Sequence, residues 1–250
     1  MFDPVFLALA VPAVTFAGMS KGGFGGGAAF VATPILALVV EPAVALAMML
    51  PLLMMMDVAA LRAYWRGWHM PSARVLILGS IPGIALAGLL YDYAPADLFR
   101  FLIGVLAVGF VIFQLVQKAG WLAFDRGAFS ARAGYVAGAV AGFTSFISHA
   151  GGPPIAVFLL AQPIGKTVYQ ATVVIVFWTI NLLKLLPFIW LGFFTAETLT
   201  VSLALAPVAL LGVWIGVRLH HLMPETYFFA LTYLLLTVTG TRLIWLSIFG

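Results

Sequence analysis

Long apolar runs, interrupted by few charged residues, constrain this chain more than any other feature of its sequence. Glycine, proline and charged residues divide the chain into ten such segments, which cover residues 4–19, 28–40, 43–63, 72–91, 96–117, 131–147, 153–161, 165–191, 197–217 and 225–248. A helix needs about 20 apolar residues to cross the hydrocarbon core of a bilayer, and the third, fourth, fifth, eighth, ninth and tenth segments are long enough. The four shorter segments form two pairs, each divided by a glycine-rich stretch.

The low charge content also indicates a membrane protein. Charged residues make up 8% of the 250 residues and hydrophobic residues 64%, whereas a soluble domain has about 25% charged residues. The apolar runs are continuous and do not alternate, which predicts spanning helices and not a β-barrel. We therefore expect a multi-pass helical protein of the cell (inner) membrane, with the lipid bilayer around it.

Other features exclude further classes of site. The chain has no cysteine, which excludes disulfides and thiolate metal sites. Its net charge of +4 fits basic residues in cytoplasmic loops better than binding to nucleic acid. No H-E-x-x-H motif occurs, and we expect no catalytic residue, no metal site and no cofactor. A homodimer is an open alternative for the assembly.

The two halves of the chain resemble each other. Gly18 and Gly142 lie 124 positions apart, and Asp57 and Asn181 share that offset. Four further pairs have an offset of 125, namely Ser20 and Ser145, Gly26 and Gly151, Gly27 and Gly152, and Pro82 and Pro207. An ordered series of matches with a slowly drifting offset indicates an internal duplication, which is a common design of transporters.

The number of traverses in each half determines how the halves are related. Joined into one helix, residues 4–40 would be about 55 Å long, too long for a hydrocarbon core of about 30 Å. The two arms of each short pair therefore enter and leave on one side, each half has five traverses, and the second half is inverted. The predicted fold is an all-α polytopic membrane protein of two inverted repeats, residues 1–117 and 131–250, joined by a cytoplasmic linker, residues 118–130. Each repeat has a Gly-rich hairpin of paired short helices, of the re-entrant type, and three spanning helices.

The distribution of charge supports this topology. One side of the inverted arrangement collects eight basic residues: Arg62, Arg66, Arg74, Lys118, Arg126, Arg132, Lys166 and Arg218. The other side has two basic residues and five acidic ones: Arg100, Arg242, Asp3, Glu41, Asp92, Asp97 and Glu197. Basic residues gather on the cytoplasmic side, so both termini are expected outside the cytoplasm. The N-terminal stretch has no basic region, which argues against a cleaved signal peptide.

The two glycine-rich stretches are the first candidate site. "SKGGFGGGAAF" begins at Ser20, and its counterpart "TSFISHAGGPP" begins at Thr144. Non-helical backbone at membrane depth is tolerated only inside protein or beside a water-filled cavity, and each bend precedes a new helix whose N-terminus attracts anions. Close helix packing is the alternative role for the glycines. We expect the substrate between the bends, bound by Ser20, Lys21, Gly22, Gly23, Gly25, Gly26, Gly27, Ser148, His149, Gly151 and Gly152.

A carboxylate and an amide lie inside apolar segments at equivalent positions of the two halves. Asp57 lies in "LPLLMMMDVAALRAYW", and its counterpart Asn181 lies one helical turn before Lys184. An ionisable residue within the membrane indicates a functional site, so Asp57 is a candidate for proton coupling, with an ion pair that fixes helix packing as the alternative. Asn181 and Lys184 are further candidates for substrate binding, although Lys184 could instead snorkel outward.

Three stretches resemble one family of transporters. They are "GMSKGGFGGGAAFVATPIL", "LPLLMMMDVAALRAYWRGW" and "GFTSFISHAGGPPIAVFLL". Over nearly the whole chain the sequence resembles the sulfite exporter TauE/SafE family, also called the toluene sulfonate uptake permease family. The resemblance implies a multi-spanning permease that moves sulfite, sulfonates or related organosulfur anions, often by export.

The expected function is therefore secondary transport of small anions and not an enzymatic reaction. The substrate would be sulfite or an organosulfonate-type organosulfur anion, moved by alternating access around a midplane site between the two bends. Three alternatives stay open: a cation or metal permease built on Asp57, His149 and Asp92, an anion channel, and an intramembrane enzyme with Ser20 and Lys21 as a nucleophile pair.

Overall fold

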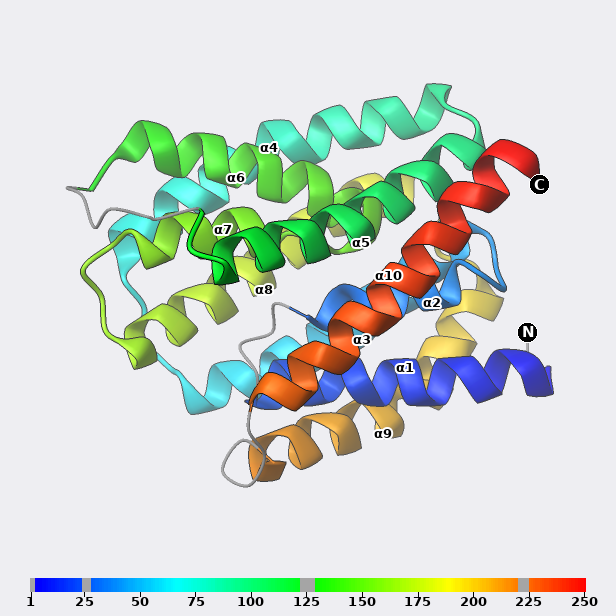
Figure 1. Ribbon diagram of the computed structural model, residues 1–250, viewed down its shortest axis with the longest axis horizontal. Helices are drawn as coiled ribbons and strands as arrows, with labels where there is room; N and C mark the ends of the chain where they lie inside the picture. Colours follow the sequence, from blue (N-terminus) through cyan, green and yellow to red (C-terminus); the bar gives the residue numbers. More distant parts are fainter. Residues whose placement is uncertain (1–2, 24–27, 122–128, 220–224) are drawn as a thin grey trace.

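The described part of the chain consists of helices (Figure 1). The computed structural model describes residues 3–23, 28–121, 129–219 and 225–250. Over these residues run ten α-helices and one 3-10 helix, in the order α1 (Pro4–Gly23), η1 (Ala29–Val31), α2 (Ala32–Leu36), α3 (Pro42–Ala63), α4 (Met70–Tyr93), α5 (Ala96–Lys118), α6 (Ala131–Ser148), α7 (Gly152–Leu160), α8 (Lys166–Trp190), α9 (Ala196–Leu219) and α10 (Glu225–Phe249). No strand occurs among them.

Seven of the described helices are long and apolar enough to cross a membrane, namely α1, α3, α4, α5, α8, α9 and α10. This finding confirms the prediction of a multi-pass helical membrane protein. It corrects the length of the first segment, which we expected to end at residue 19, because α1 has 20 residues and continues to Gly23. The helix can include Lys21 because Asp57 neutralises that charge inside the bundle.

The helices extend into both glycine-rich stretches, so the breaks between the helices are shorter than these stretches. Ser20 and Lys21 belong to the last turn of α1, and Ser148 is the last residue of α6. The second break consists only of residues 149–151, after which α7 begins. The predicted site residues Gly25, Gly26 and Gly27 lie outside the described residues, as does most of the linker.

A left-handed residue ends α6. His149 has a φ of 57°, a conformation that is uncommon for residues other than glycine. Its backbone N–H donates to the carbonyl of Ser145 at 2.9 Å, and the N–H of Ala150 donates to the carbonyl of Thr144 at 3.3 Å. This pair of bonds is the usual way to close a helix C-terminus, and it fixes the direction in which His149 leaves the helix.

Small residues bring the outer helices into close pairs. Gly18 of α1 faces the backbone of Gly212 in α9, and Gly83 of α4 faces the backbone of Ala139 in α6. In both pairs, residue numbers rise together along the contact, so α1 runs parallel to α9 and α4 runs parallel to α6. The pair α5 and α10 is antiparallel and meets at Gly104 and Gly240. Glycines allow backbones to approach this closely because no Cβ intervenes.

The centre of the bundle is formed by α3 and α8. These two helices contact each other, and α3 also contacts α9 while α8 contacts α4. Four consecutive residues of α3, Ala47 to Leu50, are fully buried. The polar residues of the candidate site lie on this central pair and on the ends of α1 and α6 that face it.

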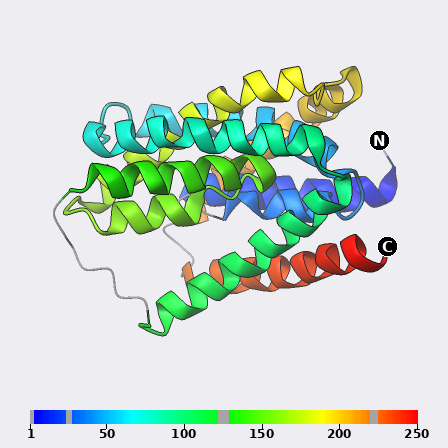
Figure 2. The same cartoon turned by 90° about the horizontal axis from the view of Figure 1, so that it is seen from above.

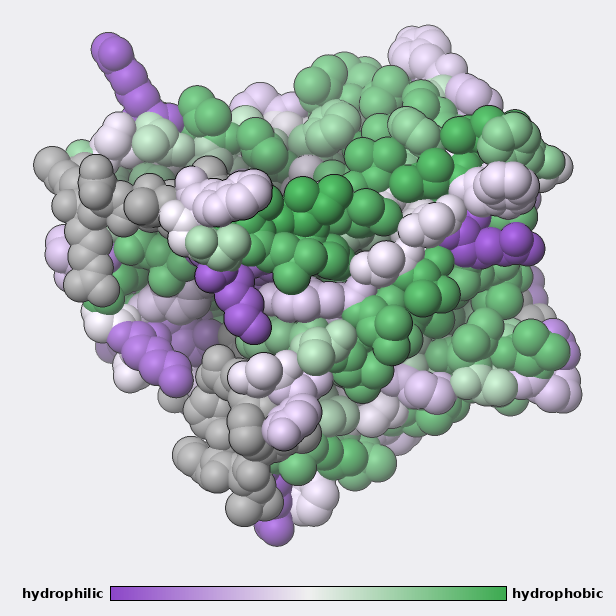
Figure 3. All heavy atoms as spheres, viewed as in Figure 1, coloured by the Kyte–Doolittle hydropathy of each residue, from purple (hydrophilic) through white to green (hydrophobic). Residues whose placement is uncertain are grey.

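The outside of the bundle is apolar. Hydrophobic side chains dominate the face that Figure 3 shows, and strongly hydrophilic ones are few. Large exposed residues include Leu86, Leu186 and Leu203, which are 61%, 73% and 75% exposed. Lipid tails can cover such a surface. The start of α1 and the end of α10 lie at the same end of the bundle (Figures 1 and 2).

Candidate functional site

One buried cluster joins Lys21 of α1, Asp57 of α3 and Asn181 of α8. The Lys21 ammonium donates to one carboxylate oxygen of Asp57, and the side-chain amide of Asn181 donates to the other at 2.7 Å. Lys21 is 6% exposed, Asp57 is fully buried, and Asn181 is 2% exposed. Both oxygens of the carboxylate are therefore occupied, and the positive charge of Lys21 is balanced. Asp57 and Asn181, which lie at equivalent positions of the two predicted repeats, therefore contact each other directly.

A second buried cluster surrounds Lys184, one helical turn after Asn181. Its ammonium lies 3.1 Å from the carbonyl oxygen of Ser145, 3.0 Å from the hydroxyl of Ser145 and 2.7 Å from Nδ1 of His149. Nε2 of His149 lies 3.2 Å from the carbonyl oxygen of Leu46 in α3. A carbonyl only accepts, so Nε2 carries the proton and Nδ1 accepts from Lys184. Lys184 therefore does not snorkel outward: it is fully buried and pointed at the break after α6.

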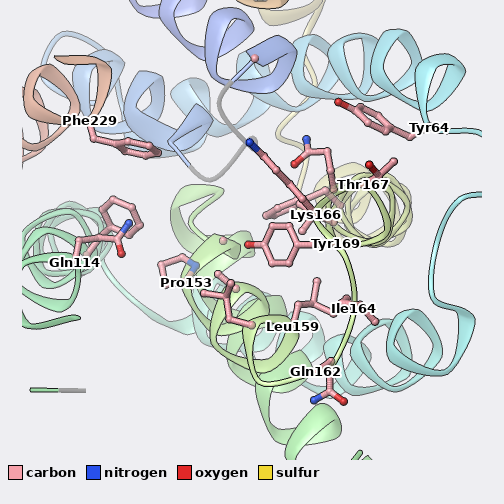
Figure 4. Close-up of a pocket in the computed structure, with 18 of the residues that line it drawn as sticks. Tyr64, Gln114, Pro153, Leu159, Gln162, Ile164, Lys166, Thr167, Tyr169 and Phe229 are labelled. Atoms are coloured by element: carbon pink, nitrogen blue, oxygen red, sulfur yellow. The ribbon is translucent and has the colours of Figure 1, made fainter. Parts of the chain in front are cut away.

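A cavity of about 670 Å³ leads toward these clusters. Gly22, Gly23, Gly152 and Pro153 belong to its lining, so the cavity touches both glycine-rich stretches. Lys166 and Thr167 of its lining are exposed at the start of α8, so the cavity opens there (Figure 4). Gln114, Gln162 and Gln170 also line the cavity. The described lining contains one lysine and no acidic residue.

Phe177 separates the cavity from Lys21. The Phe177 ring lines the cavity, and the Lys21 ammonium lies 4.6 Å from the ring centroid. This distance is within the range of a cation–π contact. A Cβ on Gly151 would lie 3.3 Å from the Phe177 ring and 3.1 Å from Cβ of Ser145, so Gly151 packs between the cavity wall and the Lys184 cluster. One layer of residues closes the deep end of the cavity.

Two serines of the site have unused hydrogen-bonding capacity. The hydroxyls of Ser20 and Ser148 are buried and have no partner in the described structure. An unpaired buried polar group is costly, and such groups in native structures call for an explanation such as a bound molecule. Both serines belong to the predicted site, and each precedes a basic residue of one cluster.

The glycines of the first stretch have a structural role as well. A Cβ on Gly22 would collide with the backbone of Val213 in α9, so Gly22 permits the close packing of α1 while it lines the cavity. The helix N-termini next to the two breaks offer an anion fewer free N–H groups than the sequence suggested. The helix α2 has only five residues, and two of the first three residues of α7 are prolines, which have no N–H to donate.

The structure thus brings the two predicted groups of residues into one region. Lys21, Asp57, Asn181, Lys184 and His149 form the two clusters described above. Asp92 lies on the surface, apart from these residues, and no group of three His, Asp or Glu side chains that could hold a metal occurs in the described ranges. The reading as a metal permease therefore has no support in this part of the chain.

Sequence reasoning missed Phe177 and the polar residues of the cavity mouth. Phe177 is one of 21 phenylalanines, and nothing in the local sequence distinguishes it. The glutamines offered a weak signal, because Gln114, Gln162 and Gln170 are amides near the ends of apolar segments. Ser145 was recognisable as the repeat partner of Ser20, and it is the side chain that holds Lys184.

Comparisons with curated proteins and with solved structures find no match for this chain. The family model described as sulfite exporter TauE/SafE matches residues 10–243, which is nearly the whole chain and includes every described residue of the two clusters. The match confirms the resemblance seen in the motifs and excludes the interpretation as an enzyme. This multi-pass membrane transporter belongs to the sulfite exporter TauE/SafE family.

Proposed function

We propose that this protein is a secondary transporter of small organosulfur anions, such as sulfite or an organosulfonate. The substrate binds near the midplane between the two glycine-rich breaks and moves by alternating access. The proposed binding residues are those predicted from the sequence, with Lys21, Ser148, His149, Asn181 and Lys184 at the centre. Asp57 is the proposed coupling residue.

One observation supports this proposal above the others. A single cavity without a described acidic residue reaches both glycine-rich stretches, and it ends one residue layer from two buried lysines. Two lysines and only one carboxylate belong to these clusters. A region inside the membrane with this excess of positive charge suits an anion.

The pattern of helix contacts supports two inverted repeats. The first repeat would match α1, α3, α4 and α5 with α6, α8, α9 and α10 of the second. Under this exchange, the parallel pair α1 and α9 becomes the parallel pair α6 and α4. Likewise, the contact of α3 with α9 becomes that of α8 with α4. In Figure 1, α1 and α6 run in opposite directions, as inversion requires.

The charge asymmetry supports an orientation with both termini outside the cytoplasm. The cavity mouth lies at the end of the bundle that carries Arg62, Lys118 and Lys166, opposite to the termini. Basic residues favour the cytoplasmic side. With this orientation, the structure corresponds to an inward-facing state, and the residue layer at Phe177 would have to open toward the other side during transport.

Flux measurements with the purified full-length protein in proteoliposomes test the proposal. We expect saturable uptake of radiolabelled sulfite or methanesulfonate, accelerated by unlabelled anion on the opposite side. An anion channel would not show this acceleration, because it has no carrier that must return. Absence of flux for every anion tested, with folded protein in the liposomes, would contradict the proposal.

Matched variants connect the flux to the site. Gly151→Val inserts a side chain between Ser145 and Phe177, where a Cβ already has three neighbours within 3.3 Å. Gly109→Val makes the same change on α5, where a Cβ has no neighbour within 4 Å. We expect the first variant to lose most of the flux and the second to keep it.

A further inference from the structure

The balance of charge in the two clusters separates the roles of the two lysines. Lys21 already has a carboxylate partner in Asp57. Lys184 has three partners, the carbonyl and hydroxyl of Ser145 and Nδ1 of His149, and all of them are neutral. Among the described residues no carboxylate contacts Lys184. The region therefore contains one positive charge more than its own residues balance.

The partners of Lys184 position the ammonium but do not neutralise it. Three neutral acceptors match the three N–H groups of an ammonium. The carbonyl of Ser145 belongs to the last turn of α6, and the C-terminal end of a helix carries about half a negative charge. That partial charge stabilises a cation only in part. Burying an ion without a full counter-charge costs several kcal/mol. An entering anion therefore gains electrostatic stabilisation from Lys184, whose charge is unbalanced. It gains less from Lys21, whose charge Asp57 already balances.

We propose that Lys184, held by Ser145 and His149, is the residue that balances the charge of the substrate, and that the site favours an anion with a single negative charge. This inference rests on the proposed function and specifies it. Sulfonates carry one fixed charge, and sulfite accepts a proton to become singly charged. Sulfate carries two charges and would leave the site with a net negative charge.

The surroundings of Lys184 offer a substrate additional contacts. The hydroxyl of Ser148, next to His149, is buried and has no partner, so it can donate to an oxygen of the anion. Gly151 lies between Ser145 and the Phe177 ring, which lines the cavity, and a movement of these residues would open a path to Lys184.

A structural alternative is that Lys184 only caps the C-terminus of α6. The two readings predict different results for Lys184→Met, which keeps the length of the side chain and removes its charge. A capping role predicts a lower melting temperature and unchanged anion binding. The charge role predicts a stable protein with weaker binding, because an apolar residue replaces an unbalanced ion.

Equilibrium binding of radiolabelled methanesulfonate to the full-length protein in detergent tests the proposal. We expect Lys184→Met to raise the Kd by about tenfold or more, since a charge-assisted contact is lost. Adding Asp57→Asn to that variant frees the charge of Lys21 and restores one unbalanced positive charge. The double variant should therefore regain much of the affinity, an outcome that a capping role cannot produce. Lys118→Met, on the exposed end of α5, is the matched control and should bind as the unaltered protein does.

Several outcomes would overturn the assignment. An unchanged Kd in Lys184→Met would remove Lys184 from the site, and a double variant as weak as the single one would exclude charge balance as the cause. If Lys184→Met does not fold, competition on the unaltered protein gives the answer: sulfate should compete at least about tenfold less well than methanesulfonate, and equal competition would overturn the single-charge assignment. An unaltered protein that neither binds nor transports any anion would instead contradict the proposed function itself.

Discussion

At the scale of single residues, the central feature is a buried ion pair whose carboxylate accepts a hydrogen bond on each oxygen. The carboxylate of Asp57 accepts from Lys21 on one oxygen and from Asn181 on the other. A charge in this environment is tolerated only when it has a partner. The pair connects α1, α3 and α8, so its loss would disturb three helices at the point where the cavity ends.

Lys21→Met should destabilise the protein strongly. The substitution leaves Asp57 buried with only Asn181 as a partner, and removal of one member of a buried ion pair costs about 3–5 kcal/mol. Lys21→Met combined with Asp57→Asn should recover most of this free energy of unfolding, because no unpaired charge remains. Unfolding in mixed micelles with increasing sodium dodecyl sulfate measures both values.

The exposed ion pair between Arg100 and Asp97 provides the control. Its atoms lie 2.7 Å apart, and its side chains are 31% and 60% exposed. Arg100→Met should cost only about 0–1 kcal/mol. A loss for Lys21→Met as small as that for Arg100→Met would show that the buried pair contributes little to stability.

At the scale of helices, glycines determine which helices can pack closely. The contacts between α1 and α9, between α4 and α6 and between α5 and α10 all place a glycine of one helix against the backbone of another. Each pair therefore holds its helices at a separation that only a residue without a Cβ allows. The same explanation applies to Gly22, for which the sequence left helix packing open as the alternative to ligand binding.

Gly83→Ala should destabilise the packing of α4 on α6. A Cβ at this position would overlap the carbonyl oxygen of Ala139, and overpacking costs about 1–3 kcal/mol. Gly109→Ala makes the same change where no atom lies within 4 Å, and it should be neutral or stabilise α5 by up to about 1 kcal/mol. Thermal unfolding in detergent compares the two. Equal melting temperatures would contradict the proposed role of the glycine contact.

At the scale of the whole molecule, the opening of the described cavity and the chain termini lie at different ends of the bundle. The cavity opens at the start of α8, and the termini lie at the other end of the bundle. The proposed inverted repeats would give the molecule a route to the opposite state, because two inverted halves can exchange their conformations. The orientation of this axis in the membrane determines which compartment the described cavity faces.

Cysteine labelling tests this orientation. The chain has no cysteine, so a single introduced cysteine is the only thiol that reacts. Gln170→Cys places a thiol in the cavity, and Tyr93→Cys places one at the other end of the bundle, on a side chain that is 85% exposed. A membrane-impermeant maleimide should modify Gln170→Cys only from the cytoplasmic side and Tyr93→Cys only from outside. The reverse pattern would contradict the proposed topology.

The sequence by itself determined the helical membrane fold, the family, and the break that follows Ser148. These properties depend on local composition: a run of about 20 apolar residues can satisfy its backbone in lipid only as a helix. The break after Ser148 was foreseen for the same reason, because "SHAGGPP" combines glycine with proline. The continuation of α1 through Lys21 was not foreseen, because the residue that makes it tolerable, Asp57, lies 36 positions away.

Only the tertiary structure decided which charges are balanced. From the sequence, Lys21 was the evident positive charge of the site, and Lys184 could as well have pointed outward. Folding places Asp57 against Lys21 and Asn181, and it places neutral groups of Ser145 and His149 against Lys184. These partners come from helices far apart in the chain. The energy of a buried charge depends on the groups that surround it in space, and no spacing along the chain contains that information.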